Sequence, residues 1–231
     1  MKYLKIFTDF IEVVEPLGDG AAGRLFKAML RYAQGGTVPA LKGKEGETVA
    51  SELVTVIDDP FYPDNPFQRS FDGEGSPAFR KEVIAGGVLQ TLLYDLSSAR
   101  AAGKQTTGNA SRLSYDSPVS IQPYTFLLAP GKLTEEELLE KCGNGVWIDF
   151  LGGLHAGANP ISGDFSLQSA GFMVEKGKKT RPVRSFTVSG NFFELLKSIT
   201  ALSDKAKLPR PGLPSVASPA VLVKELSISG K

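Results

Sequence analysis

The sequence predicts an α+β, β-rich fold: a mostly antiparallel curved sheet with a few helices, preceded by a short helical hairpin. Apolar residues recur at helical spacing over the first 36 residues. From about Leu53 their period changes to two, in short β-branched or aromatic runs separated by glycine, proline and asparagine. We therefore expect a hairpin over 1–38, a junction over 39–46 and a β-rich domain over 47–231.

The N-terminal segment predicts two helices joined by a turn. Its apolar residues keep helical spacing on both sides of Pro16-Leu17-Gly18-Asp19, which supplies the turn. Gly35-Gly36 is a strong helix stop and ends the second helix.

Seven apolar runs predict the strands of the β-rich domain. The last of them, Ala220–Ile228, follows a segment rich in proline, lysine and serine, Ser203–Ser218, which is typical of an exposed loop. The other six strands are expected at Val54–Ile57, Val83–Leu93, Tyr124–Leu128, Gly145–Asp149, Phe172–Glu175 and Val183–Val188.

Two helices interrupt the strands. Thr134–Cys142 begins with Thr134 and has Glu137 three residues later, which is the capping-box spacing. Phe192–Leu202 begins near Asn191, and three apolar residues give it a buried stripe, namely Leu195, Leu196 and Ile199.

Composition excludes several functions. With 26 basic and 25 acidic residues the net charge is +1, too small for the field of a nucleic-acid-binding protein, so no direct nucleic-acid contact is expected. No apolar run approaches the ~20 residues that span a membrane. Asp9 interrupts the apolar N-terminus where a signal peptide needs an unbroken run. The expected location is cytoplasmic.

The sequence contains one histidine and one cysteine, His155 and Cys142. A structural zinc site takes four protein ligands and a catalytic one usually three, so no metal site made of this chain's own residues is expected. Phosphate-binding glycine motifs are absent too, and no cofactor is expected.

A series of glycine-rich and polar blocks runs through the β-rich part of the chain. In this order they resemble the TldD/PmbA family, bacterial and archaeal proteins called modulators of DNA gyrase, from about Leu41 to the C-terminus. The blocks are Gly46–Pro60, Phe71–Gly75, Gly87–Tyr94, Thr106–Ala110, Gly153–Ser166, Pro182-Val183, Thr187–Asn191 and Leu226–Gly230.

The resemblance also shows what the chain lacks. The family's catalytic subunits carry H-E-x-x-x-H upstream of this region and a cysteine ligand near the C-terminus, but here Asp204–Ser218 contains no cysteine. The block Gly153–Ser166 resembles the PmbA (TldE) branch, understood as the metal-free partner of a TldD subunit.

By this resemblance the chain is a non-catalytic partner or substrate-binding module of a TldD-type metallopeptidase, with no catalytic residue of its own. Its partner is then a TldD-like subunit or a second copy in a dimer, and its substrate an unfolded peptide. The alternative is a regulatory or active subunit whose metal site is completed by another chain.

Residues 3–38 instead resemble the start of a small uncharacterised family of phage and mobile-element proteins. The two resembling parts of the chain meet within Pro39–Gly46. Either a natural gene fusion or an error in sequence assembly or gene calling explains this join. The resemblance leaves open a role for the hairpin in directing the chain to a replication or packaging complex.

Five residues are candidates for peptide binding. His155, Gly157, Asn159 and Ser162 share a loop dense in hydroxyls, amides and backbone donors, and Asn109 lies in the similar block Thr106–Ala110. Such groups suit recognition of a peptide backbone. The alternative is that both loops satisfy their own backbone groups.

Paired carboxylates and loop serines give weaker candidates. Asp58-Asp59-Pro60 and Asp72-Gly73-Glu74-Gly75 suit general acid–base chemistry or a hard cation, although turn chemistry selects the same residues and is favoured. A nucleophilic Ser162 or Ser166 needs His155 as its base, and this arrangement is disfavoured.

Overall fold

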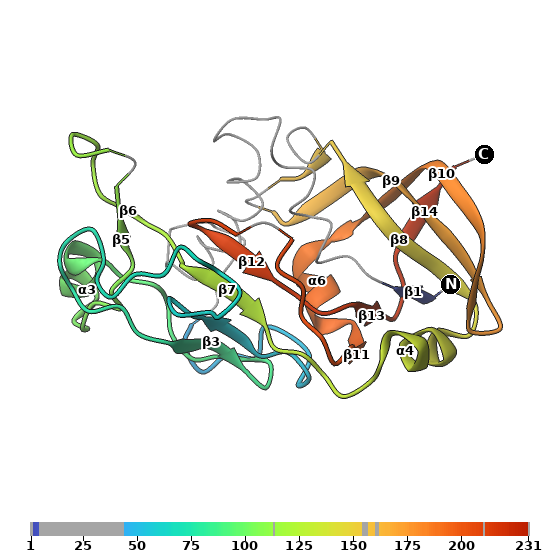
Figure 1. The fold of residues 1–231 in the computed structure, drawn as a ribbon, viewed down its shortest axis with the longest axis horizontal. Coiled ribbons are helices and arrows are strands. Elements are labelled where there is room, and N and C mark those ends of the chain that lie inside the picture. The colour runs from blue at the N-terminus through green and yellow to red at the C-terminus, as the bar shows by residue number, and fades with distance from the viewer. Residues whose placement is uncertain are drawn as a thin grey trace.

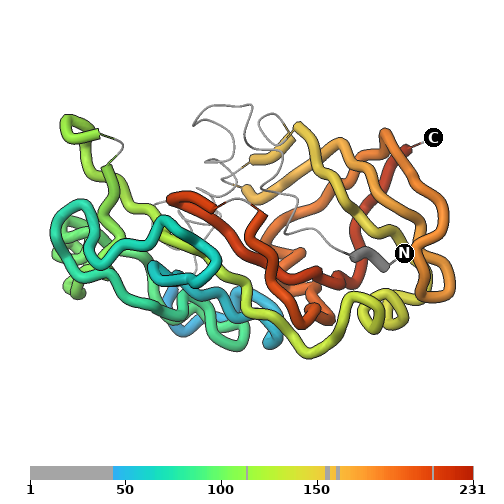
Figure 2. Tube along the Cα trace, in the orientation of Figure 1, coloured from blue at the N-terminus to red at the C-terminus, as the bar shows by residue number. Residues whose placement is uncertain are grey.

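The computed structural model describes residues 2–4, 44–112, 114–153, 157–159, 162–209 and 211–230. Within them, two larger sheets lie next to each other along the long axis, with a small hairpin at one end (Figure 1). After its first described strand, which belongs to the seven-stranded sheet, the chain builds most of the five-stranded side and then most of the seven-stranded side, and its last part returns to both (Figure 2).

The seven-stranded sheet is antiparallel except for one parallel pair, β1 with β8. Its longest strands, β9 and β10, form a hairpin that turns at Lys176 and Gly177, both with positive φ, as tight hairpin turns require. In spatial order it contains β11 (Ile199–Leu202), β13 (Val221–Val223), β1 (Lys2–Leu4), β8 (Gly145–Gly152), β9 (Asp164–Glu175), β10 (Lys178–Asn191) and β14 (Ser227–Ser229).

The five-stranded sheet is antiparallel apart from the pair β12–β7. Gly86 and Gly87, both with positive φ, turn the chain between β3 and β4. Its order is β12 (Ser215–Ala217), β7 (Thr125–Leu128), β2 (Val56–Asp58), β3 (Lys81–Ala85) and β4 (Val88–Leu89), and the separate hairpin is β5 (Ala110–Ser111) with β6 (Ser120–Ile121).

One apolar core joins the two larger sheets. Val56 and Phe126 of the smaller sheet and Ile148 and Leu167 of the larger one belong to the same buried cluster, together with residues of the helix α6 (Phe192–Lys197). On the opposite face of the larger sheet, α4 (Glu135–Cys142) covers the fully buried Trp147. Alternate residues of β8 thus pack into two different apolar cores, one on each face of the sheet.

The predicted strand-rich, mostly antiparallel fold is confirmed. Each of the six expected strand regions contains a strand, and α4 begins at Thr134 with the expected reciprocal capping bonds to Glu137. None of the described helices has the length and apolar character needed to cross a membrane.

Three local predictions are wrong. The helix expected to reach Leu202 ends at Lys197, because Ile199–Leu202 pairs with β13 instead. The expected loop Ser203–Ser218 contains strand β12 and three buried serines. The last expected strand is two strands, β13 and β14, separated in the same sheet.

One helix that was not predicted and one strand that was predicted to be helical are also present. Helix α3 (Leu96–Ala102) has Asp95 as its N-cap and Gly103 in the left-handed conformation after its last turn, which are recognisable signals. Lys2–Leu4, expected to be helical, forms β1 between β13 and β8. The rest of the predicted helical hairpin lies outside the described residues.

Candidate functional site

The described part of the Gly153–Ser166 loop is held by its own hydrogen bonds. Asn159 closes it, because its amide donates to the Asp164 carbonyl at 2.8 Å and its carbonyl accepts from Gly163 at 2.9 Å. Its side-chain Oδ1 accepts from the Ser162 amide at 3.3 Å, and the Ser162 hydroxyl accepts from the Asp164 amide at 3.3 Å. Asn159 and Ser162 therefore lie together with their side chains bonded to the loop's own backbone, as the alternative interpretation of the loop expects, while His155 lies outside the described residues.

Gly157 approaches its neighbouring strand more closely than any other residue type allows. A Cβ at this position would be 2.2 Å from the Ser166 carbonyl oxygen. The φ of Gly157 is not positive, so steric closeness requires glycine here. A valine would therefore push the loop off β9 rather than selectively block a ligand.

Asn191 connects this loop to helix α6. Its Nδ2 donates to the Ser162 carbonyl and to Asp164 Oδ1, both at 2.8 Å, while its Oδ1 accepts from the first amides of the helix. Hydrogen bonds to the exposed Asp164 carboxylate, first from the Asn191 side chain and then from the Ser162 side chain, lower the pKa of that carboxyl. The loop is thus anchored from the helix N-terminus.

Asn109 lies in a different network, on the five-stranded side. Its Nδ2 donates to Asp58 Oδ2 at 2.7 Å and to the Gln122 carbonyl at 3.0 Å. The structure does not join Asn109 to Asn159 and Ser162 by hydrogen bonds. The five candidates therefore do not form one hydrogen-bonded group among the described residues.

A buried ion pair is the centre of the Asn109 network. Lys81 Nζ lies 3.1 Å from Asp58 Oδ2, and the side chain of Asp58 is fully buried. The Tyr124 amide donates to the other carboxylate oxygen at 2.7 Å. Burial raises the pKa of Asp58 and lowers that of Lys81, while the attraction between the two opposes both changes.

The Asn109 side chain also contains an unsatisfied acceptor. Both of its amide protons point at oxygen atoms, so the orientation of the amide is fixed by its partners. Its Oδ1 is buried and has no hydrogen-bond partner in the part of the chain that the structure describes. Sequence reasoning had no signal for this network, since Asp58 and Asn109 are 51 residues apart.

The paired carboxylates divide between turns and core. Asp72 stabilises a turn, because its Oδ1 accepts from the amides of Glu74 and Ser76 at 2.9 Å. Asp59 likewise accepts from the Phe61 amide. The turn interpretation is wrong for Asp58, which lies in strand β2 and is buried with a cation.

The described donor groups do not fit a zinc site. No group of three histidine, cysteine or carboxylate residues lies close enough together within the described chain to hold a metal ion. Cys142, the last residue of α4, is buried in the same apolar cluster as Trp147. The proposed pairing of Ser162 or Ser166 with His155 lies partly outside the described residues.

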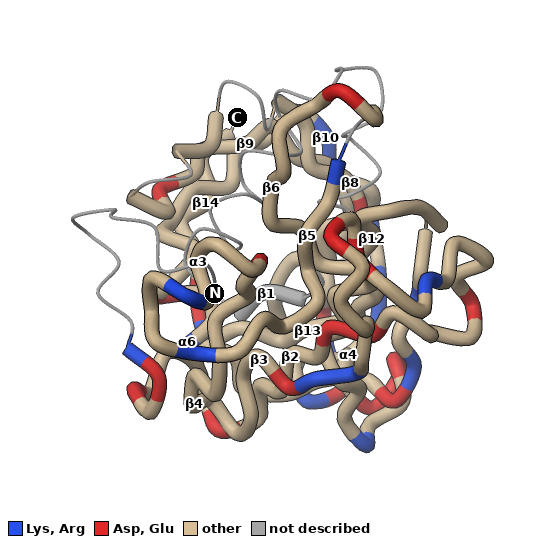
Figure 3. The backbone as a smooth tube through the Cα atoms, turned by 90° about the vertical axis from the view of Figure 1, so that its left-hand side faces the viewer, with Lys and Arg blue, Asp and Glu red and all other residues tan. Residues whose placement is uncertain are grey.

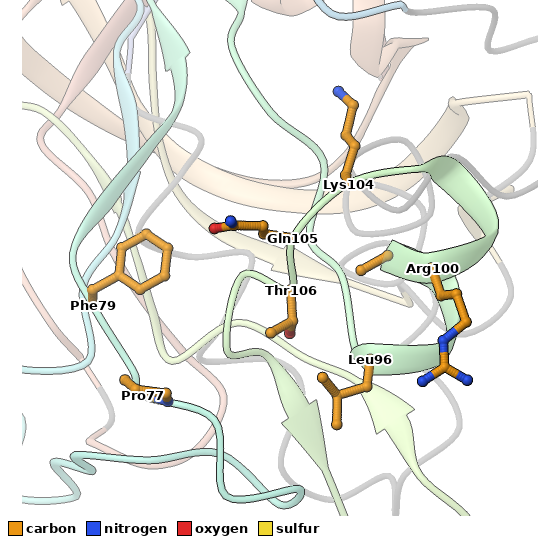
Figure 4. A pocket seen from close by; sticks show the side chains of 8 residues that line it. Pro77, Phe79, Leu96, Arg100, Lys104, Gln105 and Thr106 are labelled. Carbon is orange, nitrogen blue, oxygen red and sulfur yellow. The ribbon is translucent and has the colours of Figure 1, made fainter.

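An open groove of about 590 Å³ lies beside α3, on the five-stranded side of the molecule (Figure 4). Pro77 and Phe79 form one wall, Leu96 and Arg100 of the helix the other, and Gln105 and Thr106 lie between them. Acidic and basic residues are interspersed along the chain on this end of the molecule (Figure 3). No local sequence pattern indicates this groove, because its walls come from separate segments.

Comparison with known proteins places this geometry in a family. The model of the PmbA/TldA metallopeptidase C-terminal domain matches residues 13–230. The match begins inside the segment expected to resemble phage proteins, and no comparison shows that second resemblance.

Relatives with solved structures share the fold. A Thermotoga maritima protein described as a modulator of a DNA gyrase is 35% identical, with a TM-score of 0.79 over 91% of this chain and 48% of its own. TldE from Thermococcus kodakarensis is 26% identical, with a TM-score of 0.74 over 88% of this chain and 48% of its own.

A curated relative supports the same assignment. The metalloprotease TldD homolog of Haemophilus influenzae is 31% identical over 200 residues, which are 81% of this chain and 41% of that protein. The chain thus spans less than half the length of these relatives. It belongs to the PmbA/TldD/TldE family and corresponds to the C-terminal domain of that family.

Proposed function

We propose that this chain is a non-catalytic partner or substrate-binding module of a TldD-type metallopeptidase complex. The family match, together with a sequence that offers one histidine and one cysteine, supports the proposal. A catalytic zinc site usually takes three protein ligands, more than these two residues provide. The partner is a TldD-like subunit or a second copy of the chain, the substrate is an unfolded peptide, and the complex is cytoplasmic.

Peptide contact by this module is assigned to His155, Gly157, Asn159 and Ser162, with Asn109 as a second point. The supporting observation is that Asn159 and Ser162 lie together in a loop anchored to α6. A rigid loop presents its remaining backbone groups to a ligand at low entropic cost. The N-terminal segment, if it acts separately, directs the chain to a phage-type replication or packaging complex.

Co-expression with a TldD-type subunit from the same genome tests the proposal. We expect a stable complex whose peptide cleavage is abolished by a chelator. The chain alone is expected to cleave no unfolded peptide, with or without added zinc. Chelator-sensitive cleavage by the chain alone would refute a non-catalytic role.

The alternative is a subunit that contributes residues to a metal site shared with another chain. Substituting His155→Ala distinguishes the two. In a shared site this variant lowers the zinc content of the complex, whereas a purely peptide-contacting histidine leaves zinc unchanged and weakens peptide binding. Elemental analysis of the purified chain alone should show no stoichiometric zinc under either proposal.

A further inference from the structure

The groove beside α3 is open to solvent and combines apolar with polar lining residues. Phe79 and Leu96 are 46% and 45% exposed, and the groove also contacts Pro77 and Ala99. Exposed apolar residues that occur singly need no explanation, whereas neighbouring ones on the two walls of a groove form a surface that a ligand side chain can cover.

The apolar surface continues beyond the groove along a short hairpin. Phe71 pairs with Pro77 in an antiparallel bridge, so the two side chains point to the same face. Phe79 is two residues beyond Pro77 and extends that face into the groove. Phe71 is 65% exposed, which makes this stripe of three residues, Phe71, Pro77 and Phe79, accessible along its length.

Both walls of the groove are held rigidly. Asp72 fixes the hairpin, since its carboxylate accepts from Glu74, Ser76 and, at 3.0 Å, the Ala110 amide. Helix α3 has a capping box at Asp95, and the Leu96 amide donates to Glu74 across the groove's end. A preorganised apolar surface binds a ligand without the entropic cost of ordering loops.

Among the described residues the groove has one cation without an ion-pair partner, Arg100, and the Glu74 carboxylate lies at its end, where it accepts from the Leu96 amide at 2.9 Å. Two of its lining residues are cations, Arg100 and Lys104, and none of the described lining residues is acidic. Lys104 is paired with Glu45, and its ammonium points away from the other side chains (Figure 4). Arg100 is exposed and has no ion-pair partner among the described residues.

We propose that this groove binds an extended peptide segment in which an apolar or aromatic side chain is followed by a carboxylate. The apolar side chain lies between Phe79 and Leu96, and the carboxylate pairs with Arg100, whose planar guanidinium suits bidentate contact. The proposal rests on the proposed peptide-binding role and names the class of peptide and a second contact surface for it.

Fluorescence anisotropy with short labelled peptides tests the proposal on the intact chain. The probe is Ac-Gly-Ser-Phe-Glu-Gly-Ser, and the comparison peptides replace Phe by Ser or Glu by Lys. We expect the chain to bind the probe at least tenfold more tightly than either comparison peptide. Raising the salt concentration should lower the affinity for the probe, because salt screens the contact between its carboxylate and Arg100.

Charge reversal provides the decisive variant. Arg100→Glu should weaken the Phe-Glu probe at least tenfold and restore binding of the Phe-Lys peptide. The matched control, Lys178→Glu on the exposed β9–β10 hairpin, should change neither affinity. Phe79→Ser should abolish binding of both peptides, while circular dichroism shows an unchanged fold.

Three results would overturn the proposal. Equal affinity for all three peptides would show that neither groove feature selects them, and undiminished binding by Arg100→Glu would remove the carboxylate contact. A dimer of the wild-type chain that Phe79→Ser disperses would mean that a second copy covers the groove. Binding of the Arg100→Glu variant to a TldD-type subunit is measured separately. A variant that still forms this complex but no longer binds the probe shows that the groove, and not the partner interaction, has been lost.

Discussion

The five-stranded and seven-stranded sheets share a core but are stabilised differently. The five-stranded side buries a charged pair, Asp58 and Lys81, within a polar network. Both sides have glycines in close backbone contact, but the shortest such distance is on the seven-stranded side, at Gly171, where a Cβ would be 1.9 Å from the Trp147 carbonyl oxygen. The first side should therefore be sensitive to loss of charge and the second to added volume.

The largest effect is expected for Asp58→Ala. Removing one member of a buried ion pair leaves Lys81 uncompensated and should cost about 3–5 kcal/mol of unfolding free energy. Glu135→Gln, which breaks the exposed pair with Lys207, should cost about 0–1 kcal/mol. Urea unfolding of both variants checks the difference, and equal small losses would show that the buried pair is not a critical element.

Gly171→Ala should have the next largest effect. The added methyl group meets backbone atoms of β8, which cannot rotate away, so the variant should lose about 1–3 kcal/mol. Gly212→Ala is the matched control, because its nearest atom would be 3.8 Å away. Equal midpoints of thermal unfolding for the two variants would contradict the prediction, because they would mean that the sheet accommodates a methyl group at position 171.

A smaller effect is expected where a cation covers the single tryptophan. Lys179 Nζ lies 3.5 Å from the Trp147 ring centroid, and such a contact contributes about 0.5–1 kcal/mol at an exposed site. Lys179→Met should lose that amount and alter the tryptophan fluorescence. Lys178→Met, one position away and exposed, should leave the emission unchanged.

The smallest effect concerns pH and Asp164. Its pKa is lowered in the folded state, so the unfolded chain binds more protons just below the usual value of 3.8. The stabilisation is present above pH 3.8 and is lost as pH falls through the lowered pKa. Acid unfolding of Asp164→Asn should therefore show a stability deficit that shrinks over this range, whereas a constant deficit would contradict the assigned cause.

Local signals predicted much of the seven-stranded side. Thr134 and Glu137 define α4 because capping involves residues three apart in sequence. The same reasoning failed beyond Lys197, since Ile199 keeps helical spacing with Leu195 yet pairs with Val223. Strand pairing over long sequence separation here overrides the local pattern.

The five-stranded side was harder to predict because its features are non-local. Asp58 precedes another aspartate and a proline, which locally indicates a turn, and only the fold brings Lys81 and Asn109 to it. The groove is similar, since Phe79 and Leu96 belong to different segments. By contrast, the hydrogen bond from the Ser162 amide to Asn159 Oδ1 spans only three residues and agrees with the alternative that the loop satisfies its own backbone groups.

The central claim is that this chain supports catalysis by another subunit and has none of its own. One measurement tests it directly: peptide hydrolysis by the chain, by a TldD-type subunit and by their co-purified complex, each with added zinc and with a chelator. We expect no hydrolysis by the chain and chelator-sensitive hydrolysis by the complex. Zinc-dependent hydrolysis by the chain alone, or failure of the two chains to co-purify, would contradict the claim.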